Sequence, residues 1–219
     1  MVFFFSMKSY AKILIMKIKV FDELSEIYEK HGHSLYIVGG TSRDLLLHRP
    51  FTDLDFVSDA TPEEEKAFLP EANYVFAKYG SIRLKRDGLE VDITTLREES
   101  DYIDHRHPLK IIFVRDLETD SLRRDFTINA IYLDKAYQIF DFHQGKADLE
   151  KRIIRFIGDP DKRIQEDPLR ICRAERFARL LDFKLDAKTE EAIQRNRYLL
   201  KEIKPAKLDE EERKGWNRK

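Results

Sequence analysis

The chain has 219 residues, of which 42% are hydrophobic and 37% are charged, and its formal net charge at pH 7 is −1. This length can bury a substantial core, and we expect one domain and part of a second. The balanced charge excludes a globally basic nucleic-acid-binding chain, so any RNA affinity has to come from local basic clusters. The single cysteine, Cys172, excludes intrachain disulfides and CxxC-type zinc sites and fits a reducing cytoplasm.

The first 19 residues are apolar in patches, but lysines interrupt the patches too often for a membrane span. They also lack the small-residue cleavage site of a signal peptide. The stretch therefore fits neither a membrane span nor a signal peptide. Residues 20–31 then have the apolar spacing of an amphipathic helix.

The segment from Leu35 to Val57 organises the chain. An apolar run at residues 36–38 predicts a buried strand that stops at Gly39 and Gly40, and Ser42 is expected to cap a helix over residues 43–47. Two glycines at a helix entrance let backbone N–H groups approach a phosphate, although such a turn is more often purely structural.

Asp53 and Asp55 follow in what the pattern predicts to be a second strand. The two-residue period of a strand puts both carboxylates on one face and turns Leu54 into the core. Two oxygen ligands on one face suit Mg²⁺, which binds carboxylates together with substrate phosphates. An isolated Asp-x-Asp is usually a solvated strand edge, but its occurrence within about twenty residues of the Gly-Gly turn favours nucleotide chemistry.

Downstream, Thr61 is expected to cap a short helix that begins at Pro62. Residues 81–85 and 89–94 predict a β-hairpin, with Asp92 in its second strand. Residues 97–108 are dense in charge and lack an apolar period, so we expect a mobile loop there.

The second half of the chain contains two further motifs. The first is RRDFTINA at residues 123–130, whose two adjacent arginines need anionic partners. The alternative is that both arginines are ordinary surface charges. Residues 163–181 have the spacing of a packed helix, on which Asp167 and Arg170 would lie side by side, with a simple intrahelical salt bridge as the alternative. A second helix is expected over residues 187–203, and residues 204–219 look too charged to pack.

These motifs, in this order, resemble the class II tRNA nucleotidyltransferases, the family of CCA-adding enzymes and of the bacterial poly(A) polymerases similar to them. The resemblance rests on the Gly-Gly, Arg43-Asp44 and Asp-x-Asp segment, on RRDFTINA, and on EDPLRICRAERFA at residues 166–178. It runs from about residue 16 to about residue 203, and the later helical domains of the family are missing. Chains of the family usually open a short distance before the first helix, so the resemblance implies an N-terminal extension, and we hypothesise that residues 1–15 precede the native start.

The resemblance implies an α+β fold: a polymerase-β-like nucleotidyltransferase head, with a mixed β-sheet and flanking helices, followed by an all-α neck, truncated relative to the family. The expected domains are the N-terminal extension (1–19), the head (20–157), the helical neck that selects the nucleotide (158–203) and a charged C-terminal tail (204–219).

The resemblance also implies site residues. Asp53 and Asp55 are expected to be catalytic and to hold Mg²⁺, and Asp92 is a candidate third carboxylate unless it is a strand residue that is hydrogen-bonded locally. The residues expected to bind nucleotide are Gly39, Gly40, Arg43, Arg124, Asp125, Asn129, Asp167, Arg170, Arg173 and Arg176. Arg97, Tyr102 and Arg106 are expected in a flexible loop that helps to switch nucleotide choice, which argues against a CC-only enzyme.

The function implied is template-independent addition of CCA to tRNA 3′ ends from CTP and ATP, with release of pyrophosphate and two-metal-ion catalysis, in the cytoplasm and without a membrane. The sequence carries no signal for an oligomeric state. An A-adding enzyme or a poly(A) polymerase is the nearest alternative. A truncated, non-catalytic nucleotide- or RNA-binding module and a nucleotidyltransferase acting on a small molecule or a protein are the other two.

Overall fold

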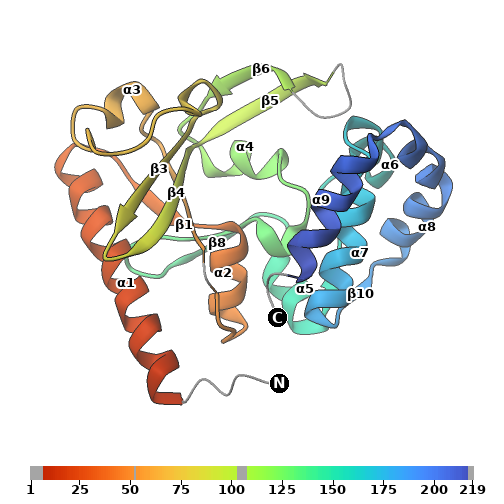
Figure 1. Ribbon diagram of the computed structural model, residues 1–219, viewed down its shortest axis with the longest axis horizontal. Helices are drawn as coiled ribbons and strands as arrows, with labels where there is room; N and C mark the ends of the chain where they lie inside the picture. The colour runs from red at the N-terminus through yellow and green to blue at the C-terminus, as the bar shows by residue number, and fades with distance from the viewer. Residues whose placement is uncertain (1–6, 52, 103–107, 217–219) are drawn as a thin grey trace. The chain divides into compact units, whose positions relative to one another are not determined.

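A computed structural model describes residues 7–51, 53–102 and 108–216 (Figure 1). The chain forms two compact units, each assembled from separate stretches of sequence. Unit 1 takes the described residues of Met1–Glu98 together with Ile112–Asp120 and Ile131–Phe140, and unit 2 takes those of Glu99–Ile111 with Ser121–Ala130 and Asp141–Lys219. The predicted domain boundaries at residues 19, 157 and 203 remain predictions.

A mixed six-stranded sheet forms the centre of unit 1, with the strand order β3-β4-β2-β1-β7-β8. Its strands are β1 (Leu35–Ile37), β2 (Leu54–Ser58), β3 (Ser81–Arg86), β4 (Leu89–Thr95), β7 (Ile131–Leu133) and β8 (Ile139–Asp141). Strand β2 pairs in parallel with β4 and antiparallel with β1. The predicted hairpin is confirmed as β3 and β4, which pair antiparallel through a turn at Asp87 and Gly88, both with positive φ.

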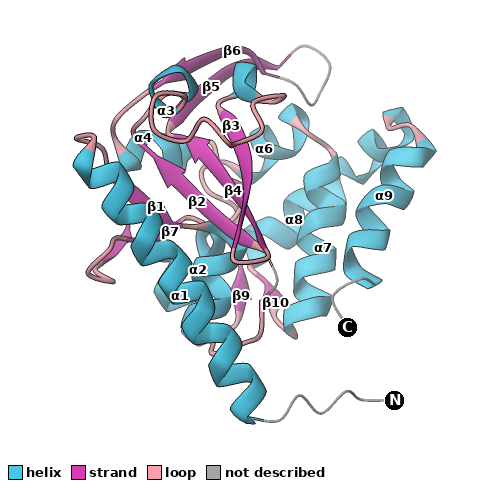
Figure 2. Cartoon of the chain, turned by 60° about the vertical axis from the view of Figure 1, so that its left-hand side comes forward, coloured by secondary structure: helices cyan, strands magenta, loops and turns pink. Residues whose placement is uncertain are grey.

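Helix α1 (Met7–Lys30) covers one face of this sheet (Figure 2). Its residues Val20, Phe21 and Leu24 share a buried cluster with alternate strand residues such as Ile37 and Phe56. The neighbouring strand residues point to the opposite face, where a second buried cluster contains Val38, Val57, Leu96, Leu117 and Tyr132. Helix α1 starts well before the predicted helix at residue 20, because it continues through the stretch expected to be an extension.

Two further corrections concern the middle of the chain. Residues 97–108 do not form one loop: β5 (Arg97–Tyr102) and β6 (Pro108–Phe113) make a two-stranded sheet, and residues 103–107 lie outside the described residues. The polar sequence of β5 has no strand pattern of its own. It forms a strand because it pairs with the apolar β6, so the pairing partner outweighs the low intrinsic β-propensity of β5. Helix α4 (Leu117–Leu122) follows.

Unit 2 is mostly helical. It contains the 3₁₀ turn η2 (Thr127–Asn129), α5 (Gly145–Lys151), the parallel strands β9 (Ile153–Ile154) and β10 (Lys184–Leu185), and the helices α6 (Pro160–Glu166), α7 (Leu169–Leu181), α8 (Ala187–Asn196) and α9 (Pro205–Trp216) (Figure 1). The helix expected over 187–203 ends at Asn196 and continues as the 3₁₀ helix η3 (Arg197–Glu202).

The helix predicted over residues 163–181 is two helices, α6 and α7, broken at Asp167 and Pro168. Asp167 has extended backbone angles, φ −150° and ψ 99°. A proline disfavours the helical conformation of the residue before it, so Pro168 ends α6 and starts the chain on a new helix axis. Asp167 and Arg170 therefore do not share a helix, contrary to the prediction.

The C-terminal segment is also helical, although its charge suggested that it would not pack. Helix α9 packs on α7 within unit 2, and Glu211 on α9 is buried against Arg176 on α7. The ion pair compensates the cost of taking the Glu211 carboxylate out of water. The composition of the segment alone does not reveal that such a partner exists. Among the described residues, no helix is long and apolar enough to cross a membrane.

A buried acid stabilises unit 1 in a pH-dependent way. Thr61 caps α3 (Pro62–Glu65), as predicted, and the structure shows that this cap is a capping box with Glu64. This short helix inserts Glu65 into the core. Glu65 is 0% exposed, and Tyr28 on α1 donates a hydrogen bond of 2.5 Å to its Oε1. Burial raises the pKa of the Glu65 carboxyl to about 8, although the Tyr28 hydrogen bond acts in the opposite direction.

We expect Glu65→Gln to flatten the pH dependence of stability. Because the folded-state pKa lies above the unfolded value, the wild-type contribution is complete below about pH 4.5 and is lost as pH rises through about 8. The slope in that window is at most about 1.4 kcal/mol per pH unit. Glutamine imitates the neutral acid, so the variant should melt near the wild-type temperature at pH 5 and above it at pH 9.

The control for this experiment is Glu63→Gln on the same helix, where the side chain is exposed. Thermal melting followed by circular dichroism from pH 5 to pH 9 is the measurement. Parallel curves for wild type and Glu65→Gln would show that Glu65 is ionised in the fold.

Candidate functional site

The predicted site residues fall into two groups, one in each unit. Unit 1 contains Gly39, Gly40, Arg43, Asp53, Asp55, Asp92 and Arg97. Unit 2 contains Tyr102, Arg124, Asp125, Asn129, Asp167, Arg170, Arg173 and Arg176. Arg106 lies outside the described residues.

The aspartates of unit 1 lie at the start of β2. The strand begins at Leu54, so Asp53 precedes it rather than belonging to it, while Asp55 is its second residue. Leu54 is buried in the cluster beneath α1, as predicted. The alternation of a strand turns Asp55 to the other face of the sheet. Asp53 is exposed and Asp55 is half-buried.

Gly39 lies directly beside Asp55. It is the first residue of α2 (Gly39–Leu46), with Val38 as N-cap, and its φ is +69°. A Cβ on Gly39 would lie 3.4 Å from Asp55 Oδ2, in van der Waals contact with this carboxylate, and the positive φ is the conformation that favours glycine here. The expected cap at Ser42 is wrong: Ser42 is buried inside the helix, and its Oγ donates to the Gly39 carbonyl at 3.3 Å.

Thr41 fastens the start of β2 and was missed by the sequence reasoning. Its Oγ1 donates to the carbonyl of Asp53 at 3.0 Å and accepts from the N–H of Asp55 at 2.8 Å. This one buried hydroxyl therefore fixes the backbone on both sides of Leu54. The only sequence signal was a threonine directly after the Gly-Gly pair, whose side chain could replace a ladder bond.

Arg43 is almost completely buried and is paired with its neighbour Asp44. Its Nε and Nη2 donate to the two Asp44 carboxylate oxygens at 2.9 and 2.8 Å. This bidentate pair neutralises a buried guanidinium inside α2. The predicted contact of Arg43 with a nucleotide remains a prediction.

Asp92 lies next to Asp55, because the two are Cα partners in the parallel β2–β4 pair. Its carboxylate accepts from Arg83 Nε at 2.6 Å and from Arg83 Nη2 at 3.0 Å. This cross-strand pair on the β3–β4 hairpin is the local hydrogen bonding that was the alternative for Asp92. A role as third carboxylate remains a prediction.

The chemistry of this end of unit 1 fits a hard divalent cation. Asp53 and Asp55 supply carboxylate oxygens, and Gly39 leaves the space beside Asp55 Oδ2 unfilled by a side chain. Within the described residues, no group of three or more His, Cys, Asp or Glu side chains forms a closed metal cage. A carboxylate pair without a cage is the arrangement in which Mg²⁺ binds together with substrate phosphates.

In unit 2 the predicted residues converge on Asp125. Its Oδ1 accepts from Arg170 Nε at 2.9 Å, and its Oδ2 pairs with Arg173 Nη2 at 2.6 Å. Burial opposes ionisation of Asp125, but the guanidinium groups of Arg173, Arg170 and Arg163 outweigh it and hold the pKa of this carboxyl below its usual range. Asp125 is thus an anion that positions two arginines.

Arg163, which the sequence reasoning did not single out, holds the chain before Asp125. Its Nη2 donates to the carbonyls of Arg123 and Arg124 at 2.6 and 3.0 Å. The backbone of the RRD segment is therefore fixed from α6. Asn129 closes the following turn η2, and its N–H bonds the Phe126 carbonyl. In the sequence, Arg163 is one of several basic residues on a predicted helix, and nothing there indicates that it binds main-chain carbonyls.

Arg170 and Arg173 differ in exposure, which separates their possible roles. The Arg170 side chain is 5% exposed, and its Nη1 also donates to Glu166 and to the Arg163 carbonyl, both at 2.6 Å. The Arg173 side chain is 38% exposed. Asp167 caps the next turn, with its Oδ1 accepting from the Leu169 N–H at 3.0 Å, and burial raises the pKa of the Asp167 carboxyl.

Arg176 is part of a buried ion pair. Its Nε and Nη2 donate to Glu211 Oε1 at 3.0 and 2.6 Å, and its guanidinium lies 4.4 Å from the centroid of the Phe177 ring. Although burial disfavours the charged carboxylate, Arg176 lowers the pKa of Glu211. The described contacts of Arg176 therefore connect α7 to α9. This contact was not expected, because residues 204–219 were predicted not to pack.

The residues predicted in the flexible loop are placed differently. Arg97 begins β5 in unit 1, where its N–H bonds Asp120 Oδ1 at 3.1 Å and its Nη1 bonds the Tyr79 carbonyl. Tyr102 is the last residue of β5. Arg97 is therefore anchored at the base of the hairpin rather than in a mobile segment.

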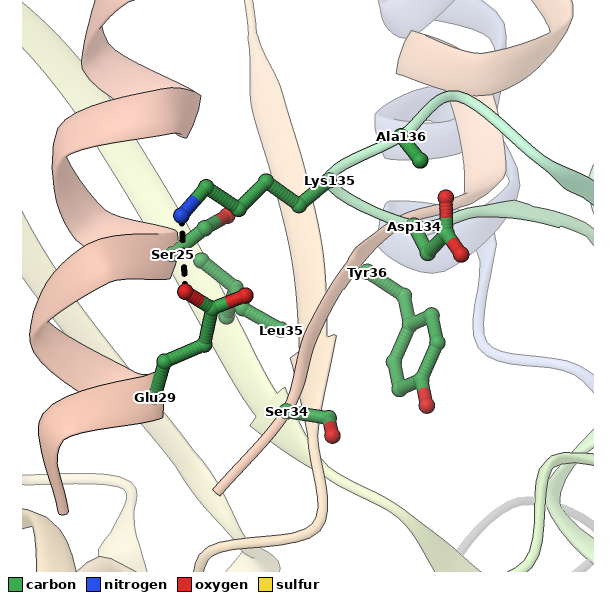
Figure 3. Close-up of a pocket in the computed structure, with 8 residues that line it drawn as sticks. All are labelled: Ser25, Glu29, Ser34, Leu35, Tyr36, Asp134, Lys135 and Ala136. Carbon is green, nitrogen blue, oxygen red and sulfur yellow. Dashed lines mark hydrogen bonds and ion pairs between the residues drawn. The ribbon is translucent and has the colours of Figure 1, made fainter. Parts of the chain in front are cut away.

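A separate pocket of about 480 Å³ lies in unit 1 between α1, β1 and the turn after β7 (Figure 3). Lys135 Nζ crosses it to Glu29 Oε2 at 2.7 Å, with Ser25, Tyr36 and Asp134 among the other lining residues. It is lined by none of the predicted site residues. Concavity alone therefore does not locate the carboxylate site.

Comparison with known proteins agrees with the arrangement of motifs. Residues 35–155 match the family described as the poly A polymerase head domain. A CCA-adding enzyme of Lactobacillus helveticus (strain DPC 4571) is 44% identical over 183 residues, which cover 84% of this chain and 46% of that enzyme.

Solved structures give the same result. The crystal structure of the Bacillus stearothermophilus CCA-adding enzyme in complex with CTP has a TM-score of 0.82 and 37% identity, covering 91% of this chain and 48% of that one. A tRNA nucleotidyltransferase complexed with a primer tRNA and an incoming ATP analog has a TM-score of 0.71 and 33% identity, covering 86% of this chain and 54% of that one. The chain spans about half the length of the relatives that it matches.

We expect Gly39→Ala to impair divalent-cation binding, with Gly88→Ala as a matched control. Both glycines have φ near +70° (+69° and +77°), but a Cβ on Gly88 would meet nothing within 4 Å. Each substitution should cost about 1–2 kcal/mol of stability through backbone strain. Only the methyl on residue 39 would contact Asp55 Oδ2 and take the space that a hydrated cation needs.

The measurement is Mn²⁺ titration by electron paramagnetic resonance, with melting temperatures recorded for both variants. Equal Mn²⁺ affinity in the two variants would show that the close approach of Gly39 does not matter for the carboxylates.

Proposed function

The chain belongs to the poly A polymerase head domain family, and from that membership we propose that it transfers nucleotides to the 3′ end of tRNA without a nucleic-acid template, adding CCA from CTP and ATP. The observation that carries the proposal is the pair Asp53 and Asp55, held at the start of β2 by Thr41 and approached by Gly39, inside the matched region. The names of the relatives support the choice of reaction, since they are CCA-adding enzymes.

In the proposed reaction the 3′-hydroxyl oxygen of the RNA attacks the α-phosphorus of the nucleotide, the hydroxyl proton is lost, and pyrophosphate leaves. Asp53 and Asp55 would hold Mg²⁺, which when bound lowers the pKa of the attacking hydroxyl and neutralises the triphosphate, in one or two ions. Thr41 fixes both aspartates through their main chain. Phosphoryl transfer asks for such positioning and charge stabilisation more than for covalent chemistry.

We assign nucleotide selection to the network around Asp125 in unit 2. Arg173 is held by Asp125 yet remains partly exposed, which suits contact with a phosphate or a base. Arg170 is fixed by Asp125, Glu166 and a main-chain carbonyl, and a guanidinium held at several points presents hydrogen-bonding groups in one orientation. Asp167, Arg124, Asn129 and Arg176 complete the proposed set. The cytoplasmic location stays a prediction.

The decisive experiment incubates the purified chain with Mg²⁺, labelled tRNA that lacks its 3′ end, and CTP, ATP or both. Sequencing gels then show which nucleotides are added. Addition of C, C and A in order supports the proposal. Addition of A alone, to tRNA that already ends in CC, identifies the A-adding alternative, and long A tracts identify a poly(A) polymerase. No addition, with ATP still bound in a separate titration, would leave a nucleotide-binding module.

Asp53→Ala and Asp55→Ala are each expected to abolish incorporation without loss of the fold, because each removes a carboxylate that would bind the cation. Glu90→Ala on β4, an exposed carboxylate of the same sheet, is the control and should be active. The measurements are the rate of incorporation and the melting temperature. Near-normal activity in either aspartate variant would refute the assignment.

Arg170→Ala is expected to weaken discrimination of CTP and ATP against UTP and GTP, because the fixed guanidinium is lost. The change also leaves Asp125 with one partner fewer, and breaking a buried pair costs about 3–5 kcal/mol. Arg170→Lys, which keeps the charge but not the bidentate geometry, is therefore tested beside it, with exposed Arg179→Ala on the same helix as control. Unchanged nucleotide preference in Arg170→Lys would remove the selection role.

A further inference from the structure

Arg163 on α6 is a buried arginine that lies between its own helix and the RRD segment of unit 2. Its Nη2 donates to the carbonyls of Arg123 and Arg124 at 2.6 and 3.0 Å, and its Nη1 donates to Glu166 Oε2 at 2.6 Å. A guanidinium is planar and rigid, so bonds at both terminal nitrogens fix its orientation. The Arg163 side chain is therefore a fixed connection between α6 and the main chain before Asp125.

Helix α6 is itself held at its N-terminal end. Asp159 caps it by accepting from the N–H of Asp161 at 2.9 Å. The Asp161 carboxylate accepts from Arg195 Nη2 at 2.7 Å and from Asn196 Nδ2 at 2.6 Å, and both of these residues stand at the end of α8. Arg163 therefore projects from a helix that is bonded to its neighbour, so its side chain starts from a fixed point.

Two routes connect Arg163 to Arg170. The first is Glu166, whose Oε2 accepts from the Nη1 atoms of both arginines at 2.6 Å. The second is Asp125, which accepts from Arg170 Nε at 2.9 Å and directly follows the carbonyls that Arg163 holds. Because a peptide unit is planar, fixing the Arg124 carbonyl also fixes the N–H of Asp125. The contacts thus close a ring in which each charged side chain is bonded to the next.

Arg163 limits the mobility of Glu166. The Glu166 side chain is 32% exposed, so its carboxylate would be free to follow Arg170 toward solvent if Arg170 were its only partner. The bond to Arg163 removes that freedom, because Arg163 is also bonded to two main-chain carbonyls. Ordering long charged side chains costs conformational entropy, and here the fold has met that cost before a nucleotide arrives.

We propose that Arg163 is a positioning residue for nucleotide selection, which acts by fixing Arg170. It does so directly through the shared Glu166 and indirectly through the main chain that places Asp125. The proposal rests on the proposed function, in which the fixed guanidinium of Arg170 distinguishes the nucleotides. Arg163 itself is assigned no contact with the nucleotide, so its side chain affects the choice between nucleotides only through Arg170.

The test uses the full 219-residue chain and the variants Arg163→Lys and Arg163→Gln, with Lys162→Gln as control. Lysine keeps the charge but lacks the two terminal nitrogens that reach Glu166 and the carbonyls at once, and glutamine keeps a planar donor without the charge. Lys162 precedes Arg163 on α6 and is exposed. The readouts are the dissociation constants of CTP and UTP with Mg²⁺ and without tRNA, the incorporation rates of both nucleotides on tRNA that lacks its 3′ end, and the melting temperature.

Both Arg163 variants should reduce the preference for CTP over UTP by about 10-fold, the effect of losing one hydrogen bond to a charged group. The preference is a ratio measured on one sample, so a smaller folded fraction does not change it. Lys162→Gln should keep the wild-type preference. An Arg163 variant that melts at a lower temperature but keeps the wild-type preference would overturn the proposal, because Arg163 would then only stabilise unit 2.

The double variant Arg163→Lys with Arg170→Lys tests the route. If Arg163 acts through Arg170, the double variant should lose no more preference than Arg170→Lys alone, because residues of one hydrogen-bonded network are not additive. Losses that multiply would show that Arg163 affects selection independently of Arg170, and the proposal would be wrong.

Failure of this inference differs from failure of the proposed function. If the wild-type chain adds no nucleotide but binds CTP better than UTP, the transfer function fails, and loss of that preference in Arg163→Lys still supports the positioning role. If wild type and both Arg163 variants add nucleotides with the same preference, the inference fails and the function stands. A wild-type chain without preference in either assay overturns both the inference and the proposed nucleotide selection.

Discussion

The alternation of side chains along β2 is the constraint on which unit 1 depends. Leu54 and Phe56 are buried beneath α1, which fixes the register of the strand and turns Asp55 to the opposite face. A shift of one residue would exchange these faces and bury a carboxylate in the apolar cluster. The free energy of core packing therefore also specifies where the charged site lies.

The main chain around Asp55 adds what the alternation cannot supply. Asp53 lies before the strand, so no β-ladder specifies its position. The Thr41 hydroxyl takes the place of ladder bonds on both aspartates, and Gly39 brings the start of α2 against Asp55. The main chain of both aspartates is thus fixed by Thr41, while only Asp55 also lies in a regular strand.

The sequence predicted the elements whose pattern is local. The β3–β4 hairpin, the Thr61 cap and the burial of Leu54 were all expected, because turn residues, caps and strand alternation act over a few residues. The strand β5 was missed because its charged sequence is paired only through its apolar partner β6. Helix α9 was missed because Glu211 becomes compatible with burial only beside Arg176, 35 residues earlier.

The same limit applies to the site. The family resemblance pointed to the residues, but not to which of them are held by protein carboxylates. Arg170 and Arg176 are both buried in ion pairs, whereas Arg173 is partly exposed while paired with Asp125. The three arginines have equal weight in the sequence, and long-range pairing separates them.

A fixed arginine has a physical advantage in a site that selects a base without a template. A mobile side chain can reorient to satisfy a wrong base, so discrimination requires that the donor cannot move without breaking other bonds. Arg170 is bound to Asp125, to Glu166 and to the Arg163 carbonyl, and Arg163 in turn holds the main chain before Asp125. Reorienting Arg170 would take one partner from Asp125 and one from Glu166, at a cost of about 1–3 kcal/mol for each lost partner. In the proposed selection site, rigidity of this kind would make a wrong base costly, because specificity depends as much on groups left unpaired as on contacts made.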